Sequence, residues 1–109
     1  RQVAERAIAQ GDITRPDLVL AFCSGQLDPA AFYGGLRAVL GERAPIIGGS
    51  AIGIITNADL SYEGSPAGAA VLQMDDVDVR VAAASAIDRD ELRAGGALGA
   101  QLGDDPAGR

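Results

Sequence analysis

Residues 45–56, PIIGGSAIGIIT, constrain the fold more than any other part of the chain. The run begins with two isoleucines, as a buried strand would, and Gly48, Gly49 and Ser50 follow directly. Glycines inside an apolar element indicate a backbone that turns sharply or lies close to another segment. We therefore predict a strand that ends in a glycine turn, with a second apolar stretch at residues 54–55.

A β-α-β unit precedes and includes this run. Residues 18–22, LVLAF, are continuously apolar, which is typical of a strand buried on both faces of a parallel sheet. Asp28 and Pro29 have the residue types that begin a helix, and an apolar stripe continues to residue 40. Because the next strand begins at residue 46, the two strands should be parallel, with a right-handed crossover.

The remaining segments predict a mixed sheet. Residues 1–10 have helical spacing, residues 57–66 predict an exposed loop, and residues 67–74 predict a strand. Val77, Val79 and Val81 alternate with charged residues, so residues 67–84 should form an antiparallel hairpin. A final helix should begin with a capping box at Asp88 and Glu91. The predicted fold class is α/β, a mixed sheet with one parallel β-α-β unit and an antiparallel hairpin, packed by helices.

Composition excludes several classes of function. The formal net charge is −6 and Lys is absent, so we expect neither a nucleic-acid partner nor an anionic membrane partner. No apolar run approaches the roughly 20 residues that span a bilayer. A lone Cys indicates a reducing, cytoplasmic location. The absence of His removes His-based catalysis and His metal ligands from this chain.

Small residues follow both predicted parallel strands, where ligands bind in open α/β sheets. These positions offer backbone N–H groups and hydroxyls, and Tyr62 and Glu63 in the following loop could close over them. The candidate ligand-binding residues are Cys23, Ser24, Gly48, Gly49, Ser50, Ala51 and Tyr62. Ordinary tight turns and an exposed loop aromatic are the alternative interpretation. The glycine spacing matches neither the dinucleotide fingerprint nor the P-loop, and a cysteine nucleophile would lack a His base.

Two segments carry a resemblance to a known family. Residues 16–24, PDLVLAFCS, and residues 44–55, APIIGGSAIGII, resemble the N-terminal region of the FIST family of bacterial sensory domains. The resemblance covers residues 3–102 and implies a ligand-sensing module, with an amino acid or related small molecule as ligand. It also implies a FIST C-terminal domain as a partner, and a histidine kinase, nucleotide cyclase or chemotaxis receptor as output.

From these observations we predict a cytoplasmic sensory domain without catalysis and without a cofactor. The chain starts at Arg1 without Met, so we expect residues 1–109 to be one domain cut from a longer protein that includes the FIST C-terminal region. Two alternatives stay open. One is an enzyme whose base comes from another domain, and the other is a structural or oligomerisation module that uses the glycine stripe Gly95, Gly99 and Gly103.

Overall fold

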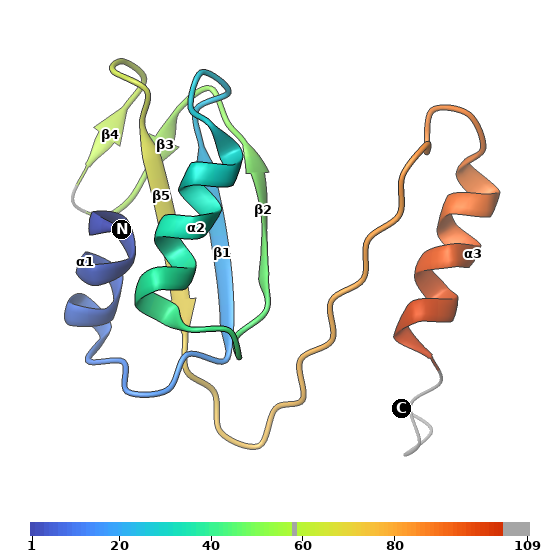
Figure 1. The fold of residues 1–109 in the computed structure, drawn as a ribbon, viewed down its shortest axis with the longest axis horizontal. Coiled ribbons are helices and arrows are strands. Elements are labelled where there is room, and N and C mark those ends of the chain that lie inside the picture. The colour runs from blue at the N-terminus through green and yellow to red at the C-terminus, as the bar shows by residue number, and fades with distance from the viewer. Residues whose placement is uncertain (58, 104–109) are drawn as a thin grey trace. The chain divides into compact units, whose positions relative to one another are not determined.

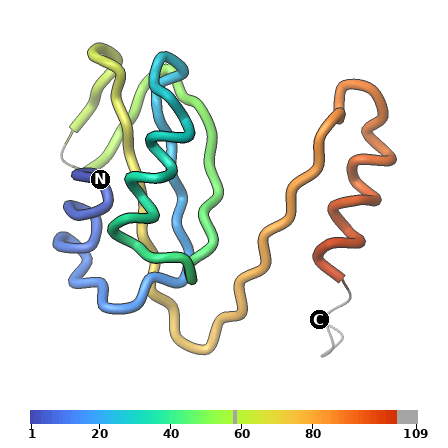
Figure 2. The backbone as a smooth tube through the Cα atoms, viewed as in Figure 1, coloured from blue at the N-terminus to red at the C-terminus, as the bar shows by residue number. Residues whose placement is uncertain are grey.

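The computed structural model describes residues 1–57 and 59–103, and the chain forms two compact units, residues 1–79 and residues 80–109. Figure 1 shows the elements and Figure 2 traces the path of the backbone through them. The first unit contains α1 (Gln2–Gly11), β1 (Leu18–Cys23), α2 (Pro29–Leu40), β2 (Ile46–Ser50), β3 (Ile54–Ile55), β4 (Leu60–Ser61) and β5 (Ala67–Leu72). The second unit contains α3 (Glu91–Leu102).

The main sheet has the strand order β2-β1-β5, and β3 pairs with β4 in a separate antiparallel ladder (Figure 1). β1 and β2 run parallel, with Val19 opposite Ile46 and Cys23 opposite Ser50. β5 runs antiparallel to β1 along its other edge. The predicted α/β class is confirmed, with a mixed sheet, one parallel β-α-β unit and an antiparallel hairpin.

The core lies between the main sheet and the helices α1 and α2. Its buried members are Ala4, Val19, Ala21, Leu36, Leu40 and Ala44. The alternate residues of β1 point to the opposite face, where Leu20 is 36% exposed and Phe22 is 43% exposed. The prediction that β1 is buried on both faces is therefore wrong for the described residues, because both helices pack on the same face.

The glycine run belongs to β2 and does not form a turn after it. Gly48 lies opposite Ala21 of β1, and a Cβ at Gly48 would collide with the carbonyl oxygen of Ala21. Of the two interpretations of these glycines, close approach to another backbone is confirmed at Gly48, and the sharp turn is wrong. The strand is longer than predicted because glycine lets the two backbones come together.

The hairpin predicted over residues 67–84 is also wrong. β5 pairs with β1, and residues 77–84 form no strand with any part of the chain that the structure describes. The hairpin of this fold is β3-β4, which lies partly in the loop predicted over residues 57–66. Alternation within a segment favours a strand, but it does not say which strand will be its neighbour.

In the second unit, α3 begins later than predicted, because its N-cap is Asp90 and not Asp88. The Asp90 carboxylate accepts a hydrogen bond of 2.9 Å from the Arg93 N–H. A Cβ at Gly95 or Gly99 would meet no atom within 4 Å, so within the described part of the second unit no residue packs on these two glycines of the predicted stripe. The assembly interface on that stripe stays a prediction.

None of the helices within residues 1–57 and 59–103 has both the length and the apolar character that crossing a bilayer requires.

Candidate functional site

A polar hollow of about 600 Å³ lies at the carboxyl ends of β1 and β2. We call it the strand-end hollow. It is lined by Ser24, Gly25, Gln26, Ser50, Ala51, Ile52, Tyr62, Glu63, Gly64, Ser65 and Pro66. The first three residues follow β1, the next three end and follow β2, and the last five precede β5. Because β5 is antiparallel to β1, Ala67 lies opposite Cys23, and the segment before β5 reaches this same end of the sheet.

Two backbone hydrogen bonds hold the strand ends together. The Ser24 N–H donates to the Pro66 carbonyl oxygen at 2.8 Å, and the Ala51 N–H donates to the Cys23 carbonyl oxygen at 2.9 Å. Sequence reasoning expected exposed backbone donors at these positions. That expectation is wrong for both amides, since each already has an acceptor within the protein. These two amides are therefore not available to a ligand in the strand-end hollow.

Side-chain groups from three segments meet in the strand-end hollow. The Ser24 hydroxyl accepts a hydrogen bond of 3.3 Å from the Gln26 N–H. The Ser65 hydroxyl donates to the Gln26 side-chain oxygen at 3.4 Å, which joins the segments on either side of the hollow. Glu63 is the one charged residue of the lining. The sequence predicted Glu63, together with Tyr62, as a loop residue that could close over a ligand, but it did not identify Gln26 or Ser65. The β1-β5 pairing brings residues 62–66 to this place.

The predicted site residues divide between two neighbouring hollows. Ser24, Ser50, Ala51 and Tyr62 line the strand-end hollow. Cys23, Gly48 and Gly49 line a second hollow, of about 510 Å³, which extends from the strand ends to α2. We call this the helix-side hollow. Ser24 and Ser50 line both, so the structure places all seven predicted residues around one end of the β1-β2 pair, but not in one cavity.

The family model for the FIST N domain matches residues 17–108, which include the strands β1, β2 and β5 and both hollows. The chain belongs to the FIST N domain family. This family is a sensory family of signal-transduction proteins. The comparisons with curated proteins and with solved structures find no match.

In this FIST N domain, Tyr62 stands directly after β4 and is 63% exposed. A Cβ at Gly53 would collide with the Tyr62 ring, so the glycine makes room for the ring beside the β2-β3 connection. The ring contributes to the wall of the strand-end hollow. Its predicted action as a lid stays a prediction.

The side chains around the two hollows are suited to hydrogen bonding. The Cys23 side chain is buried, at 5% exposure, and faces α2 in the helix-side hollow. Within residues 1–57 and 59–103, no three His, Cys, Asp or Glu side chains are grouped so that they could hold a metal ion. Hydroxyls, a carboxamide and one carboxylate remain, and these groups can orient a small polar molecule.

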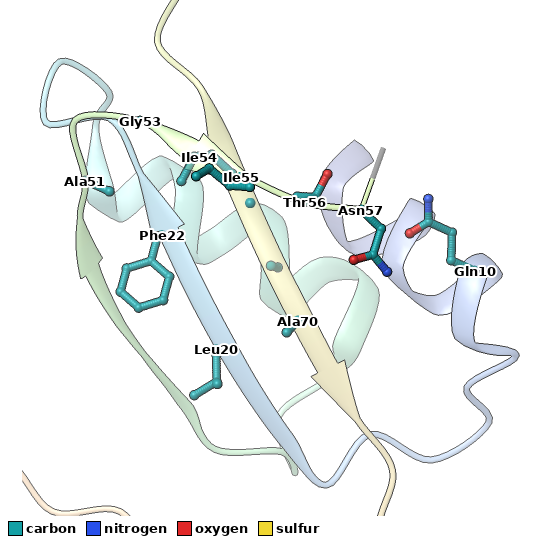
Figure 3. A pocket seen from close by; sticks show the side chains of 12 residues that line it. Gln10, Leu20, Phe22, Ala51, Gly53, Ile54, Ile55, Thr56, Asn57 and Ala70 are labelled. Carbon is teal, nitrogen blue, oxygen red and sulfur yellow. The ribbon is translucent and has the colours of Figure 1, made fainter. Parts of the chain in front are cut away.

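A further groove of about 640 Å³ lies on the sheet face that the helices leave uncovered (Figure 3). Leu20 and Phe22 project into it from β1, while Gln10 and Asn57 lie near its other end. Its lining is mainly apolar, and Ala51 is the one predicted site residue that it includes. The groove exists because neither α1 nor α2 covers this face of β1. Fewer residues with polar side chains line it than line the strand-end hollow.

Proposed function

We propose that this FIST N domain senses a small polar molecule in bacterial signal transduction, and that the strand-end hollow is the ligand site. One observation carries the proposal. Five residues with polar side chains line one hollow at the carboxyl ends of two parallel strands, namely Ser24, Gln26, Ser50, Glu63 and Ser65. Open α/β sheets bind their ligands at this end of the strands.

The ligand class that we propose is an amino acid or a related small molecule. An amino acid has an ammonium group for the Glu63 carboxylate and a carboxylate for hydroxyl and carboxamide donors. The strand-end hollow has no positively charged lining residue, which disfavours a ligand with several negative charges. Its size of about 600 Å³ suits a small-molecule ligand.

Binding without catalysis is part of the proposal. A cysteine nucleophile needs a base or a lowered pKa, and the chain contains no His to act as that base. Burial of the Cys23 side chain also keeps it from a substrate in the strand-end hollow. Both observations favour a sensor over an enzyme.

The partners that we propose follow from the family. They are a FIST C-terminal domain and an output domain, which would be a histidine kinase, a nucleotide cyclase or a chemotaxis receptor. The acidic net charge of −6 supports a role without nucleic acid and without an anionic membrane surface. The single cysteine supports a cytoplasmic location.

A thermal-shift screen of amino acids, organic acids and nucleotides on the full-length protein tests the proposal. A ligand at 100 times its Kd should add about 2.7 kcal/mol of stability. Glu63→Gln should then weaken binding of an amino acid, because it removes the charge that faces the ammonium group. Glu42→Gln is the matched control, since this side chain is 89% exposed and lies outside the hollow.

The proposal is wrong if no compound raises the melting temperature. It is also wrong if an amino acid binds and both glutamate variants bind it as tightly as the unmodified protein, because its ammonium group would then not lie beside Glu63.

A further inference from the structure

The first unit ends in a segment, residues 73–79, that we call the strap. It follows β5 directly, and Val79 is the last residue of the unit. Most of its side chains are exposed, namely Gln73, Asp75, Asp76, Val77 and Asp78. Apolar burial therefore contributes little to its order, and the strap depends on polar contacts with the rest of the first unit.

The Gln73 side chain makes the first group of these contacts. Its carboxamide oxygen accepts hydrogen bonds from the Thr14 N–H at 2.9 Å, the Arg15 N–H at 2.8 Å and the Thr14 hydroxyl at 3.2 Å. All three donors belong to the connection between α1 and β1. One side chain of the strap thus holds a loop that is almost 60 residues away in sequence.

Asp17 makes the second group of contacts. Here the accepting side chain belongs to the connection between α1 and β1, and the donor belongs to the strap. The Asp17 side chain is 8% exposed, and its Oδ2 accepts a hydrogen bond of 2.8 Å from the Met74 N–H. Its Oδ1 lies 3.0 Å from Nη2 of Arg43 and 3.4 Å from Nε of Arg15. The Asp17 N–H donates to the Leu72 carbonyl oxygen at 2.8 Å. Backbone and side chain of Asp17 therefore continue the β1-β5 pairing into the strap.

The strap and the sheet are stabilised in different ways. β1 is held by two strand ladders and by the buried side chains of Val19 and Ala21. The strap is held by hydrogen bonds to exposed or partly buried groups. Segments with few buried apolar contacts open locally at a lower free energy than the core does.

We propose that Asp17 and Gln73 form a clamp that keeps the strap closed, and that opening of the clamp releases residues 74–79 while the sheet stays folded. The clamp holds the last residues of the first unit, which ends at Val79. It stands at the opposite end of β5 from the strand-end hollow, since β5 begins after Pro66 and ends before Gln73. The clamp does not depend on the identity of any ligand.

Hydrogen–deuterium exchange by mass spectrometry on the full-length protein tests the clamp. In Gln73→Ala the Met74 amide, which donates to Asp17, should exchange about tenfold faster. In Asp17→Asn the Thr14 and Arg15 amides, which donate to Gln73, should do the same, while in both variants the amides of residues 19–23 keep their rate. Asp76→Asn is the matched control. This strap side chain is exposed and takes no part in the two groups of contacts, so the exchange pattern of the variant should equal that of the unmodified protein.

Exchange in dilute urea gives the same test without a substitution. The clamp amides of Thr14, Arg15 and Met74 should exchange through local opening, at a rate that urea hardly changes. Exchange of β1 amides should accelerate with urea, because it requires global unfolding. The clamp is refuted if the two variants leave the exchange of these clamp amides unchanged, or if the clamp amides and the β1 amides accelerate together in the variants or in urea.

Discussion

A single methyl group at Gly48 should weaken the domain, whereas the same change at the next residue should not. In Gly48→Ala, the added Cβ would collide with the carbonyl oxygen of Ala21 in the neighbouring strand. In Gly49→Ala, the added Cβ would meet no atom within 4 Å. Neither glycine has a positive φ, so backbone strain does not distinguish them. The difference in stability between the two variants therefore reports on the close approach of β1 and β2 at Gly48.

The magnitudes follow from the two environments. A Cβ at Gly48 meets backbone and not a flexible side chain, so β2 must move away from β1. Overpacking of this kind costs about 1–3 kcal/mol, and each lost ladder hydrogen bond adds about 0.5–1.5 kcal/mol. Alanine also restricts the unfolded chain, which contributes about 0.4–1 kcal/mol of stability at either position. We expect a net loss of about 2–4 kcal/mol for Gly48→Ala and a small gain for Gly49→Ala.

Urea unfolding followed by far-ultraviolet circular dichroism measures the difference. With a slope of about 1–3 kcal/mol per molar urea, the two midpoints should differ by about 1–3 M. Equal midpoints for the two variants would show that the strands do not approach each other closely at Gly48, and the placement of the glycine run within β2 would then be wrong.

Three further changes test other parts of the fold. Leu36→Ala should destabilise the domain by about 2–5 kcal/mol in urea unfolding, because Leu36 is 1% exposed in the core. Asp28→Ala should cost about 1 kcal/mol in the same assay, because its carboxylate caps α2 and accepts a hydrogen bond of 2.9 Å from the Ala30 N–H. The Met74 N–H, followed by nearby arginines, lowers the pKa of Asp17. The folded protein should therefore lose stability as pH falls through that lowered pKa, and Asp17→Asn should show a weaker loss over the same acidic range.

Local signals in the sequence were sufficient for the β-α-β unit. The apolar run of β1 lies within its observed bounds, and α2 begins at Pro29 with Asp28 as its N-cap, as predicted. These elements depend on neighbouring residues, through capping and amphipathic spacing, so a single sequence contains the information.

Strand pairing and close approach could not be predicted in the same way. The interaction that places β5 beside β1 joins residues about 50 apart, and nothing within residues 67–72 identifies that partner. Gly48 in a strand and a glycine in a turn have the same sequence signature, because both positions require the absence of a side chain. Only the position of Ala21 opposite Gly48 distinguishes them.

The candidate site was predicted where it depends on the β1-β2 pair alone. Ser24, Ser50 and Ala51 follow from the rule that ligands bind beyond the carboxyl ends of parallel strands. Gln26 did not follow, because it becomes part of the site through Ser65. Glu63 was predicted only as a loop residue that could close over the ligand, and the antiparallel course of β5 brings it into the lining.

Amide chemical shifts in nuclear magnetic resonance test most directly whether the strand-end hollow binds the ligand. Once the thermal-shift screen has identified a compound, the full-length protein is titrated with it. If the ligand binds in the strand-end hollow, the largest shifts should fall on residues 24–26, 50–52 and 62–66. Shifts centred on Leu20, Phe22 and Ala70 would instead place the ligand in the groove on the uncovered face of the sheet, and binding in the strand-end hollow would be refuted.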